Sequence, residues 1–406
     1  MHPHNSDPLE RGGPLHGVRV LELTKVWAGP YAGKLLGFLG AEVLKIESLN
    51  SLDTARYYGV GDINDAPGFR AVNPQKMSVQ IDMKTAVGID LIVDLIRHCD
   101  VVIENFRPGA AKRLGLGYEA IRRVKPDIVY VSMSMHGSEG PLSYQTGYAP
   151  GFSALSGVTF SVGYEDGPPT GMNVRYGDAT FGATAAYAAV VALLHRRRTG
   201  LGQFVDVSAA ESISSMIADV FMEFALTGNV PGRNGNTHPD MVPHGIYPCR
   251  EKQWIAIAVS SQEQWRALAD TLGDRALAED TRFESLADRK ANRHMIDRLI
   301  AAKTLQHDAN ALASELQRRG VAAAKSADSV DLVSDPQLWS DGFFPTVTDR
   351  ADETRPVVGP SWRMSRDAAV VQGAPRLGEH TARVFEDLLG LSAEARQRLH
   401  LAKVTY

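Results

Sequence analysis

The chain has 406 residues, of which 44% are hydrophobic and 22% charged, and its formal net charge is −4. These values are ordinary for a globular enzyme built from two or three structural units. The slightly acidic balance argues against a nucleic-acid or membrane partner, because no global positive field is present.

Only two cysteines are present, Cys99 and Cys249. They exclude a disulfide-rich scaffold and a four-cysteine zinc site, and they fit a reducing compartment. The polar opening MHPHNSDPLERGG lacks the apolar core of a signal peptide, and we expect no segment that crosses a bilayer. The sequence therefore predicts a cytoplasmic protein.

Strands alternate with helices in the first third of the chain. GVRVLEL (17–23) is an apolar run, AGPYAGKLLGFLGA (28–41) has helical spacing, and EVLKIE (42–47) has the pattern of a second strand. Two similar units follow, from MSVQIDM to DVVIENF and from YEAIRRV to VYVSMS. This order predicts an α/β fold with a doubly wound parallel sheet, whose ligands bind at the carboxyl ends of the strands.

The common nucleotide and metal motifs are absent from the sequence. No GxGxxG follows a strand, which disfavours a nicotinamide dehydrogenase, and no GxxxxGK[ST], HExxH or GxSxG occurs. Two histidines in NTHPDMVPHGIYP could suggest a metal, but Pro and Gly there indicate an ordered loop. We predict no metal and no tightly bound cofactor.

The remaining elements suggest a second, smaller domain. The loop GNVPGRNGNTHPDMVPHG (228–245) is typical of a domain junction, WIAIAV indicates a strand, and 262–319 is largely helical in pattern. From about Pro345 the chain is irregular before a final helix, EHTARVFEDLLGLSAEARQRL. We predict a large domain over 1–225, a small α+β domain over 226–335 and a C-terminal segment over 336–406.

Asp178 is the main candidate for chemistry. It stands before a long run of small apolar residues in NVRYGDATFGATAAYAAVVALLHRRRTGLGQ. An Asp after Gly177 is favoured as the N-cap or a first-turn residue of a helix. A helix of small residues can also bring its N-terminus against a ligand, where its dipole would keep the carboxylate ionised. Such a carboxylate can attack an activated acyl group without a general base, so the two roles are compatible.

Basic residues follow two other predicted strands. ENFRPGAAKRLGLG places Asn105, Phe106, Arg107 and Arg113 after one strand, and Lys84 in IDMKT follows another. The arginines could hold phosphates by forked hydrogen bonds, and Phe106 could pack on an adenine ring. A solvated basic turn explains the same residues equally well.

Several stretches together resemble one known family. These are GVRVLELTKVWAGPYAGKLLGFLGAEVLKIES, ENFRPGAAKRLGLG, GDATFGATAAYAAVVALLHRRRTGLGQFVDVS, MVPHGIYPC and LGEHTARVFEDLLGLS. They are similar to class III CoA-transferases, the group of formyl-CoA transferase, carnitine CoA-transferase and α-methylacyl-CoA racemase. The resemblance covers nearly the whole chain, in order.

The resemblance implies a fold and a site. The family's catalytic aspartate falls on Asp178. Its CoA-contacting positions fall on Val26, Ile81, Lys84, Asn105, Phe106 and Arg113. The family's large domain is Rossmann-like and built from both chain termini, and two subunits interlock so that the active site lies near their interface. A homodimer is therefore expected, although a heteromer with a paralogous subunit stays open.

Two positions depart from relatives in the family. Formyl-CoA transferase carries Gln where this chain has Trp27, so a bulky apolar ring suggests an acid larger or less polar than formate or oxalate. The racemase has a His where this chain has Tyr148. With a reference pKa near 10, Tyr is a poor partner for two-base proton exchange, which favours a transferase over an epimerase.

The resemblance implies an acyl-CoA:carboxylate CoA-transferase. Asp178 would form a mixed anhydride with the acyl group and then an aspartyl-CoA thioester, with CoA as a substrate. The loop from His238 to Gly245 would contact the substrate and supply N–H groups for the oxyanion, and Arg175 or His238 could pair with a second carboxylate. TKVWAGP and MVPHGIYP resemble transferases that use succinyl-CoA. An acyl-CoA epimerase and a CoA-binding subunit of a heteromeric transferase stay as alternatives.

Overall fold

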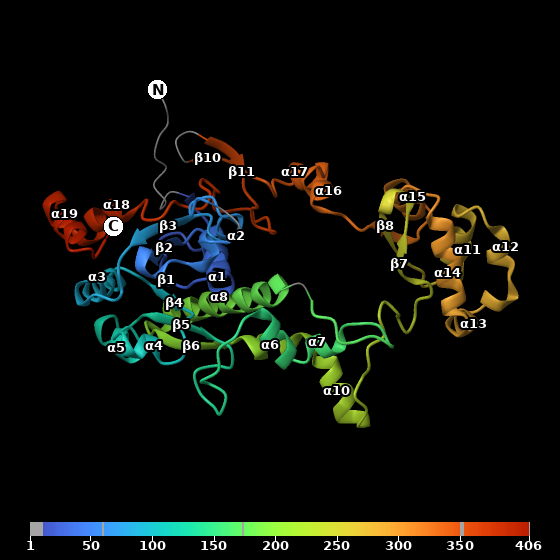
Figure 1. Cartoon of the computed structure of the whole chain (residues 1–406), viewed down its shortest axis with the longest axis horizontal. Coiled ribbons are helices and arrows are strands. Elements are labelled where there is room, and N and C mark those ends of the chain that lie inside the picture. The colour runs from blue at the N-terminus through green and yellow to red at the C-terminus, as the bar shows by residue number, and fades with distance from the viewer. Residues whose placement is uncertain (1–10, 59–60, 173, 350–352, 406) are drawn as a thin grey trace. The chain divides into compact units, whose positions relative to one another are not determined.

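The computed structural model describes residues 11–58, 61–172, 174–349 and 353–405 (Figure 1). The chain forms two compact units. The first comprises the residues up to Phe160, Gly171–Pro231 and the residues from Trp339 onwards. The second comprises Ser161–Thr170 and Gly232–Leu338. The first unit thus contains the described residues that are nearest to both termini.

A six-stranded parallel sheet forms the centre of the first unit. Its strands are β1 (Arg19–Leu23), β2 (Glu42–Glu47), β3 (Lys76–Gln80), β4 (Val101–Glu104), β5 (Val129–Ser134) and β6 (Gln203–Ser208). Their order is β3-β2-β1-β4-β5-β6. Chain order therefore reverses between β1 and β4, as in the Rossmann-like sheet that the family resemblance implies.

Helices cover both faces of this sheet (Figure 1). The helices of the first unit before β6 are α1 (Ala28–Phe38), α2 (Pro67–Val72), α3 (Ala86–Arg97), α4 (Ala110–Arg113), α5 (Tyr118–Val124), α6 (Ala149–Leu155), α7 (Val158–Ser161) and α8 (Val174–Thr199). After β6 come α9 (Ala209–Ser214) and α10 (Ala218–Thr227). α1 packs against α8, whereas α3 packs against α5. One continuous core lies on the face of the sheet that α3 and α5 cover, and it is formed by apolar side chains of the strands and of these two helices. Strands of a parallel sheet are buried on both faces.

The other face of the sheet carries buried charges beneath α1. Glu22 on β1 lies beside Lys45 on β2, and the ammonium of Lys76 on β3 lies 2.7 Å from Glu22 Oε2. All three side chains are fully buried. A Cβ on Gly33 of α1 would lie 1.8 Å from Glu22 Oε2, so only glycine lets the helix approach these charges.

The C-terminal segment returns to the first unit. It contains a hairpin of β10 (Thr346–Asp349) and β11 (Glu353–Pro356), then α18 (Thr381–Leu389) and α19 (Ala393–Leu401). α18 packs against α3 and β3 (Figure 1). Two helices thus stand where the sequence predicts one, because Gly390 ends α18 in the left-handed conformation with a φ of 62°.

The second unit has a small antiparallel sheet. Its strands are β7 (His244–Pro248), β8 (Trp254–Ala258) and β9 (Ala322–Lys325), in the order β7-β8-β9. The helices of this region are α11 (Gln262–Thr271), α12 (Arg275–Glu279), α13 (Leu286–Ala291), α14 (Arg293–Thr304), α15 (Ala309–Arg318), α16 (Ser329–Val333) and α17 (Pro336–Ser340). Buried residues such as Trp265, Phe283 and Ile300 form a separate core. The prediction placed 161–170 in the large domain, whereas this segment clusters with the second unit.

α8 differs from expectation in two ways. It begins at Val174, four residues before Asp178, and its first turn contains no acidic residue. The prediction of Asp178 as an N-cap or first-turn residue is therefore wrong.

Within the described part of the chain, Arg175–Thr199 is also long and apolar enough to cross a membrane by length and composition alone, which we did not expect. Core helices of soluble proteins pass the same test, and α8 packs on α1, β5 and β6.

Candidate active site

A pocket of about 300 Å³ lies at the carboxyl ends of β1, β4 and β5. Lys25 and Val26 follow β1, Asn105 and Phe106 follow β4, and Ser134 ends β5. The strand order reverses between β1 and β4, and crevices at such points bind ligands in open α/β sheets. The topology thus places this pocket where a ligand is expected.

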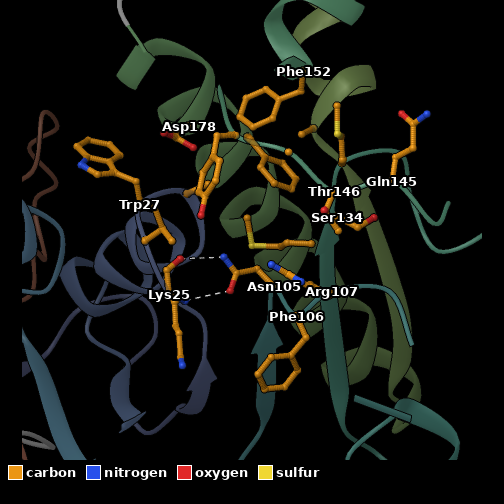
Figure 2. A pocket seen from close by; sticks show the side chains of 18 of the residues that line it. Lys25, Trp27, Asn105, Phe106, Arg107, Ser134, Gln145, Thr146, Phe152 and Asp178 are labelled. Atoms are coloured by element: carbon orange, nitrogen blue, oxygen red, sulfur yellow. Dashed lines mark hydrogen bonds between the residues drawn. The ribbon is translucent and has the colours of Figure 1, made fainter. Parts of the chain in front are cut away.

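The pocket joins segments that are far apart in sequence (Figure 2). Asp178, Trp27 and Phe152 lie together at one end, and the Phe106 ring lies at the opposite end of the view. The lining residues are Lys25, Val26, Trp27, Ala28, Asn105, Phe106, Arg107, Pro108, Met133, Ser134, Met135, Gln145, Thr146, Gly147, Tyr148, Phe152, Asp178, Phe181 and Ala209. Of the predicted site residues, this set contains Asp178, Trp27, Tyr148, Val26, Asn105, Phe106 and Arg107.

Close helix packing holds Asp178 at this pocket. A Cβ on the preceding Gly177 would lie 2.8 Å from Phe152 Cε2 on α6. One turn after Asp178, a Cβ on Gly182 would lie 2.5 Å from the carbonyl oxygen of Ala28 at the start of α1. Residues four apart share a helix face, so Asp178 and Gly182 both face the start of α1. The two glycines therefore let α8 bring the carboxylate into the pocket.

The carboxyl of Asp178 is half-buried, and burial raises its pKa from 3.8 to about 6. We expected the helix dipole to keep this carboxylate ionised, but the second-turn position is past the free N–H groups of the helix start. Among the described residues, its side chain has no hydrogen-bond or ion-pair partner. The group is thus half-buried and unpaired, and a carboxyl with a pKa of about 6 is mostly ionised at neutral pH.

Asp178 is the one carboxylate among the described residues that line the pocket, and no histidine or cysteine joins it there. The hydroxyls of Ser134 and Tyr148 also line the pocket. A hydroxyl needs a neighbouring base to become a nucleophile, whereas a carboxylate does not. The pocket therefore favours Asp178 as the nucleophile.

The turn between β1 and α1 has an unusual backbone. Val26 has a φ of 73°, a left-handed conformation that is rare for a β-branched residue. Trp27 follows as the N-cap of α1 and stacks on Tyr31, with ring centroids 5.5 Å apart. The Arg175 guanidinium lies 5.9 Å from the centre of the Trp27 ring. The indole of Trp27 is thus held between α1 and α8.

Asn105, which follows β4, binds the turn that follows β1. Its Oδ1 accepts a hydrogen bond from the Lys25 N–H at 2.9 Å, and its Nδ2 donates to the Lys25 carbonyl at 2.9 Å (Figure 2). Next to it, the buried Glu104 accepts hydrogen bonds from the Phe106 N–H at 2.7 Å and from Ser132 Oγ at 2.6 Å. That Asn105 contacts CoA stays a prediction. In this structure its carboxamide binds the backbone of Lys25 and so holds the turn after β1.

Three predicted CoA-binding residues lie outside the lining of this pocket. Ile81 is fully buried in the main core. The exposed Lys84 donates to the Asn50 carbonyl at 3.3 Å, and Arg113 is exposed on α4. His238 and Gly245 belong to the second unit, where Gly245 lines a different pocket. Their part in the reaction stays a prediction.

Sequence reasoning missed the pocket wall formed by β5 and the loop after it. Ser134, Gln145 and Thr146 line the pocket (Figure 2). The hydroxyl oxygen of Ser134 is buried without a hydrogen-bond partner among the described residues. Ser134 could have been found from the sequence, because it ends a predicted strand. Asn105 and Lys84 were selected for the same reason.

Comparisons with known proteins identify the family of this chain. The family model for CoA-transferase family III matches residues 15–381. The chain belongs to CoA-transferase family III. It is therefore an enzyme that transfers CoA.

This CoA-transferase is similar to proteins with named activities. It is 33% identical over 393 residues to a succinyl-CoA–D-citramalate CoA-transferase of Chloroflexus aurantiacus, covering 96% of this chain and 98% of that protein. It is 31% identical over 391 residues to a succinate–glutarate CoA-transferase of Agrobacterium fabrum, covering 94% and 98%. Among solved structures, a CAIB/BAIF family protein from Brucella suis matches with a TM-score of 0.86 and 31% identity, covering 93% and 100%.

Proposed function

We propose that this enzyme is an acyl-CoA:carboxylate CoA-transferase in which Asp178 carries the group being transferred. The observation that supports this most is the unpaired, half-buried carboxylate at the ligand edge of the sheet, in a pocket whose described lining has no histidine and no second carboxylate. Transfer between two carboxylates conserves the energy of the thioester, so the reaction needs a nucleophile and a CoA site rather than an energy source.

The proposed mechanism has two halves. A carboxylate oxygen of Asp178 attacks the carbonyl carbon of the donor thioester, the C–S bond breaks, and CoA leaves as a thiolate. The mixed anhydride that results is attacked by this thiolate at the Asp178 carboxyl carbon, so the donor acid leaves and an aspartyl-CoA thioester forms. The acceptor carboxylate then repeats these steps in reverse order and leaves as the new CoA ester. Electrons and charges balance without a proton transfer.

Other residues have assigned roles in this proposal. Phe106 and Arg107 hold the nucleotide end of CoA, because an aromatic ring can pack on adenine and a guanidinium binds phosphate. Trp27 and Tyr148 border the acyl group near Asp178.

We assign succinyl-CoA as the donor and a small dicarboxylic acid as the acceptor. Proteins with these activities in their names cover nearly the whole chain at 33% and 31% identity. The test is a screen of dicarboxylic and monocarboxylic acids with succinyl-CoA and with acetyl-CoA, read by the mass of the CoA product. A new CoA ester from a dicarboxylic acid supports the assignment, and transfer to monocarboxylic acids alone refutes it.

An epimerase is the second candidate, since a carboxyl with a pKa of about 6 also suits a general base near neutral pH. Incubating the enzyme with a branched acyl-CoA in heavy water, without an acceptor acid, separates the two functions. Deuterium at the α-carbon would favour the epimerase, whereas the transferase leaves this carbon unlabelled.

The rate of transfer should depend on pH through Asp178. Burial raises its pKa to about 6, and only the ionised form attacks the thioester. We expect kcat/KM to be constant above about pH 7 and to fall about tenfold per pH unit well below pH 6. The measurement is initial rates from pH 4.5 to 9, with circular dichroism at each pH to confirm that the protein stays folded. A flat profile through pH 5 would contradict this role.

We also propose that two copies interlock as a homodimer in the cytoplasm. None of the residues of α10 is buried within the chain, and Phe221, Met222 and Phe224 are exposed on it. A surface of this kind is typical of an interface. Both cysteines are free, which fits a reducing compartment. Light scattering after gel filtration should give twice the 44.1 kDa of one chain, and the mass of a single chain would exclude the dimer.

A further inference from the structure

The turn from Lys25 to Trp27 is held by buried groups outside the pocket. Asp53, which is 1% exposed, accepts a hydrogen bond on Oδ1 from the Val26 N–H at 2.9 Å. The same oxygen accepts the Ala55 N–H at 3.0 Å. Its other oxygen lies 3.2 Å from the ammonium of Lys45. This carboxylate therefore connects the turn to the buried charges beneath α1.

The ammonium of Lys45 fixes the residues just before the turn. It donates to the Thr24 carbonyl at 2.9 Å and to Glu22 Oε1 at 3.0 Å. Together with the two hydrogen bonds between Asn105 and Lys25, these contacts occupy the backbone polar groups from Thr24 to Val26 in succession. A turn with so many fixed groups has little freedom to change its conformation.

The backbone of Val26 explains why such restraint is needed. A left-handed φ of 73° is unfavourable for a β-branched side chain and persists only where the surroundings impose it. Of the groups that hold this turn, Asp53 is the one whose side chain binds Val26 itself, and it is not among the residues that line the pocket. Trp27 and Ala28, the next two residues, do line it. The strained conformation therefore sets where the start of α1 meets Asp178.

We infer that Asp53 is a positioning residue for the proposed transfer reaction: it imposes the left-handed conformation of Val26 and so places Trp27 and the start of α1 against the Asp178 carboxylate. The inference rests on the proposed function for its effect on rate, but its structural part stands apart from that function. Small displacements of groups that border a nucleophile lower the rate strongly, because the acyl carbon must lie within reach and in line.

The chain offers a matched control for Asp53. Glu47 is also a buried carboxylate of this region, but it binds Arg56 at 2.7 Å and Ser78 Oγ at 2.8 Å rather than the turn. Replacement of either carboxylate removes one buried negative charge and should lower the unfolding temperature. Only replacement of Asp53 should alter the turn.

The test compares Asp53→Ala, Asp53→Asn and Glu47→Gln with the parent enzyme in kinetics and in crystal structures. We expect Asp53→Ala to lower kcat by about 10- to 100-fold while the KM for the acyl-CoA changes less than about threefold. Asp53→Asn keeps an oxygen that can accept the Val26 N–H, so it should restore kcat to within about fivefold of the parent. Glu47→Gln should keep kcat within about twofold, although it lowers the unfolding temperature.

Crystal structures decide the inference independently of activity. In Asp53→Ala, Val26 should leave the left-handed region and the Trp27 ring should shift. An unchanged Val26 conformation, an unchanged kcat, or an equal loss in Glu47→Gln would each overturn the inference. A parent enzyme without CoA transfer would refute the proposed function, and the structure of the Val26 turn would still decide the role of Asp53.

If Asp53→Ala does not fold, Asp53→Leu tests the same contact, because leucine fills the volume without an acceptor for the Val26 N–H. It should also lower kcat at least tenfold. An Asp53→Leu enzyme with parental kcat and with Val26 still in the left-handed conformation would overturn the inference.

Discussion

Asp178→Ala is expected to lower kcat for CoA transfer by about 10⁴-fold or more, because the proposed reaction has no other route to the covalent intermediate. Binding of free CoA should change less than about threefold, since the Phe106 ring, which we propose packs on the adenine, lies at the opposite end of the view from Asp178 (Figure 2). The measurements are steady-state transfer from succinyl-CoA and calorimetric titration with CoA.

Two controls keep this result interpretable. Asp90→Ala removes an exposed carboxylate on α3, outside the pocket, and should leave the rate unchanged. In Asp178→Asn, the unfolding temperature should rise at pH 8 but not below pH 4. The pKa of Asp178 is raised from 3.8 to about 6, so its ionised form costs stability above that range and not below it. Retention of more than about 1% of the transfer rate in Asp178→Ala would exclude the nucleophile role.

Lys45→Met is expected to lower the free energy of unfolding by about 3–5 kcal/mol, the largest stability effect that we predict. The ammonium is fully buried and lies within 3.2 Å of both Glu22 and Asp53. Burial lowers the pKa of Lys45, but the nearby carboxylates of Glu22, Asp53 and Glu47 outweigh it and raise that pKa overall. Without the lysine, buried carboxylates are left uncompensated.

Urea denaturation followed by far-ultraviolet circular dichroism measures this change. Lys112→Met, which removes an exposed lysine of α4, serves as the control and should cost less than about 0.5 kcal/mol. Equal stabilities of Lys45→Met and Lys112→Met would show that the buried charges do not stabilise the fold.

The strands of the large sheet were largely predictable, because each one has a recognisable pattern in its own short stretch of sequence. Buried parallel strands are apolar runs between turn residues, and the predicted strand 42–47 coincides with β2. Short strands of the second unit were missed because AAAK in β9 has no β-branched residue, and its pairing with β8 decides its conformation. Strand order also has no local signal, so the reversal between β1 and β4 became visible only in the structure.

The site was predictable in its residue types but less so in its geometry. Asp178 was identified, yet the start of α8 was misplaced, because Gly177 looked like a helix boundary and is in fact needed for contact with Phe152. The contact between Asn105 and Lys25 joins residues 80 apart in sequence, and the contact between Asp53 and Val26 joins residues 27 apart. No short motif encodes such pairs.

The most direct measurement is to trap the acyl-enzyme. The enzyme is incubated with succinyl-CoA alone, treated with hydroxylamine or borohydride, digested and analysed by mass spectrometry. We predict a hydroxamate or an alcohol at the Asp178 side chain, formed only when the CoA thioester is present and absent from Asp178→Ala. An active enzyme that yields no modified peptide at Asp178, or one that is modified at another residue, would contradict the mechanism.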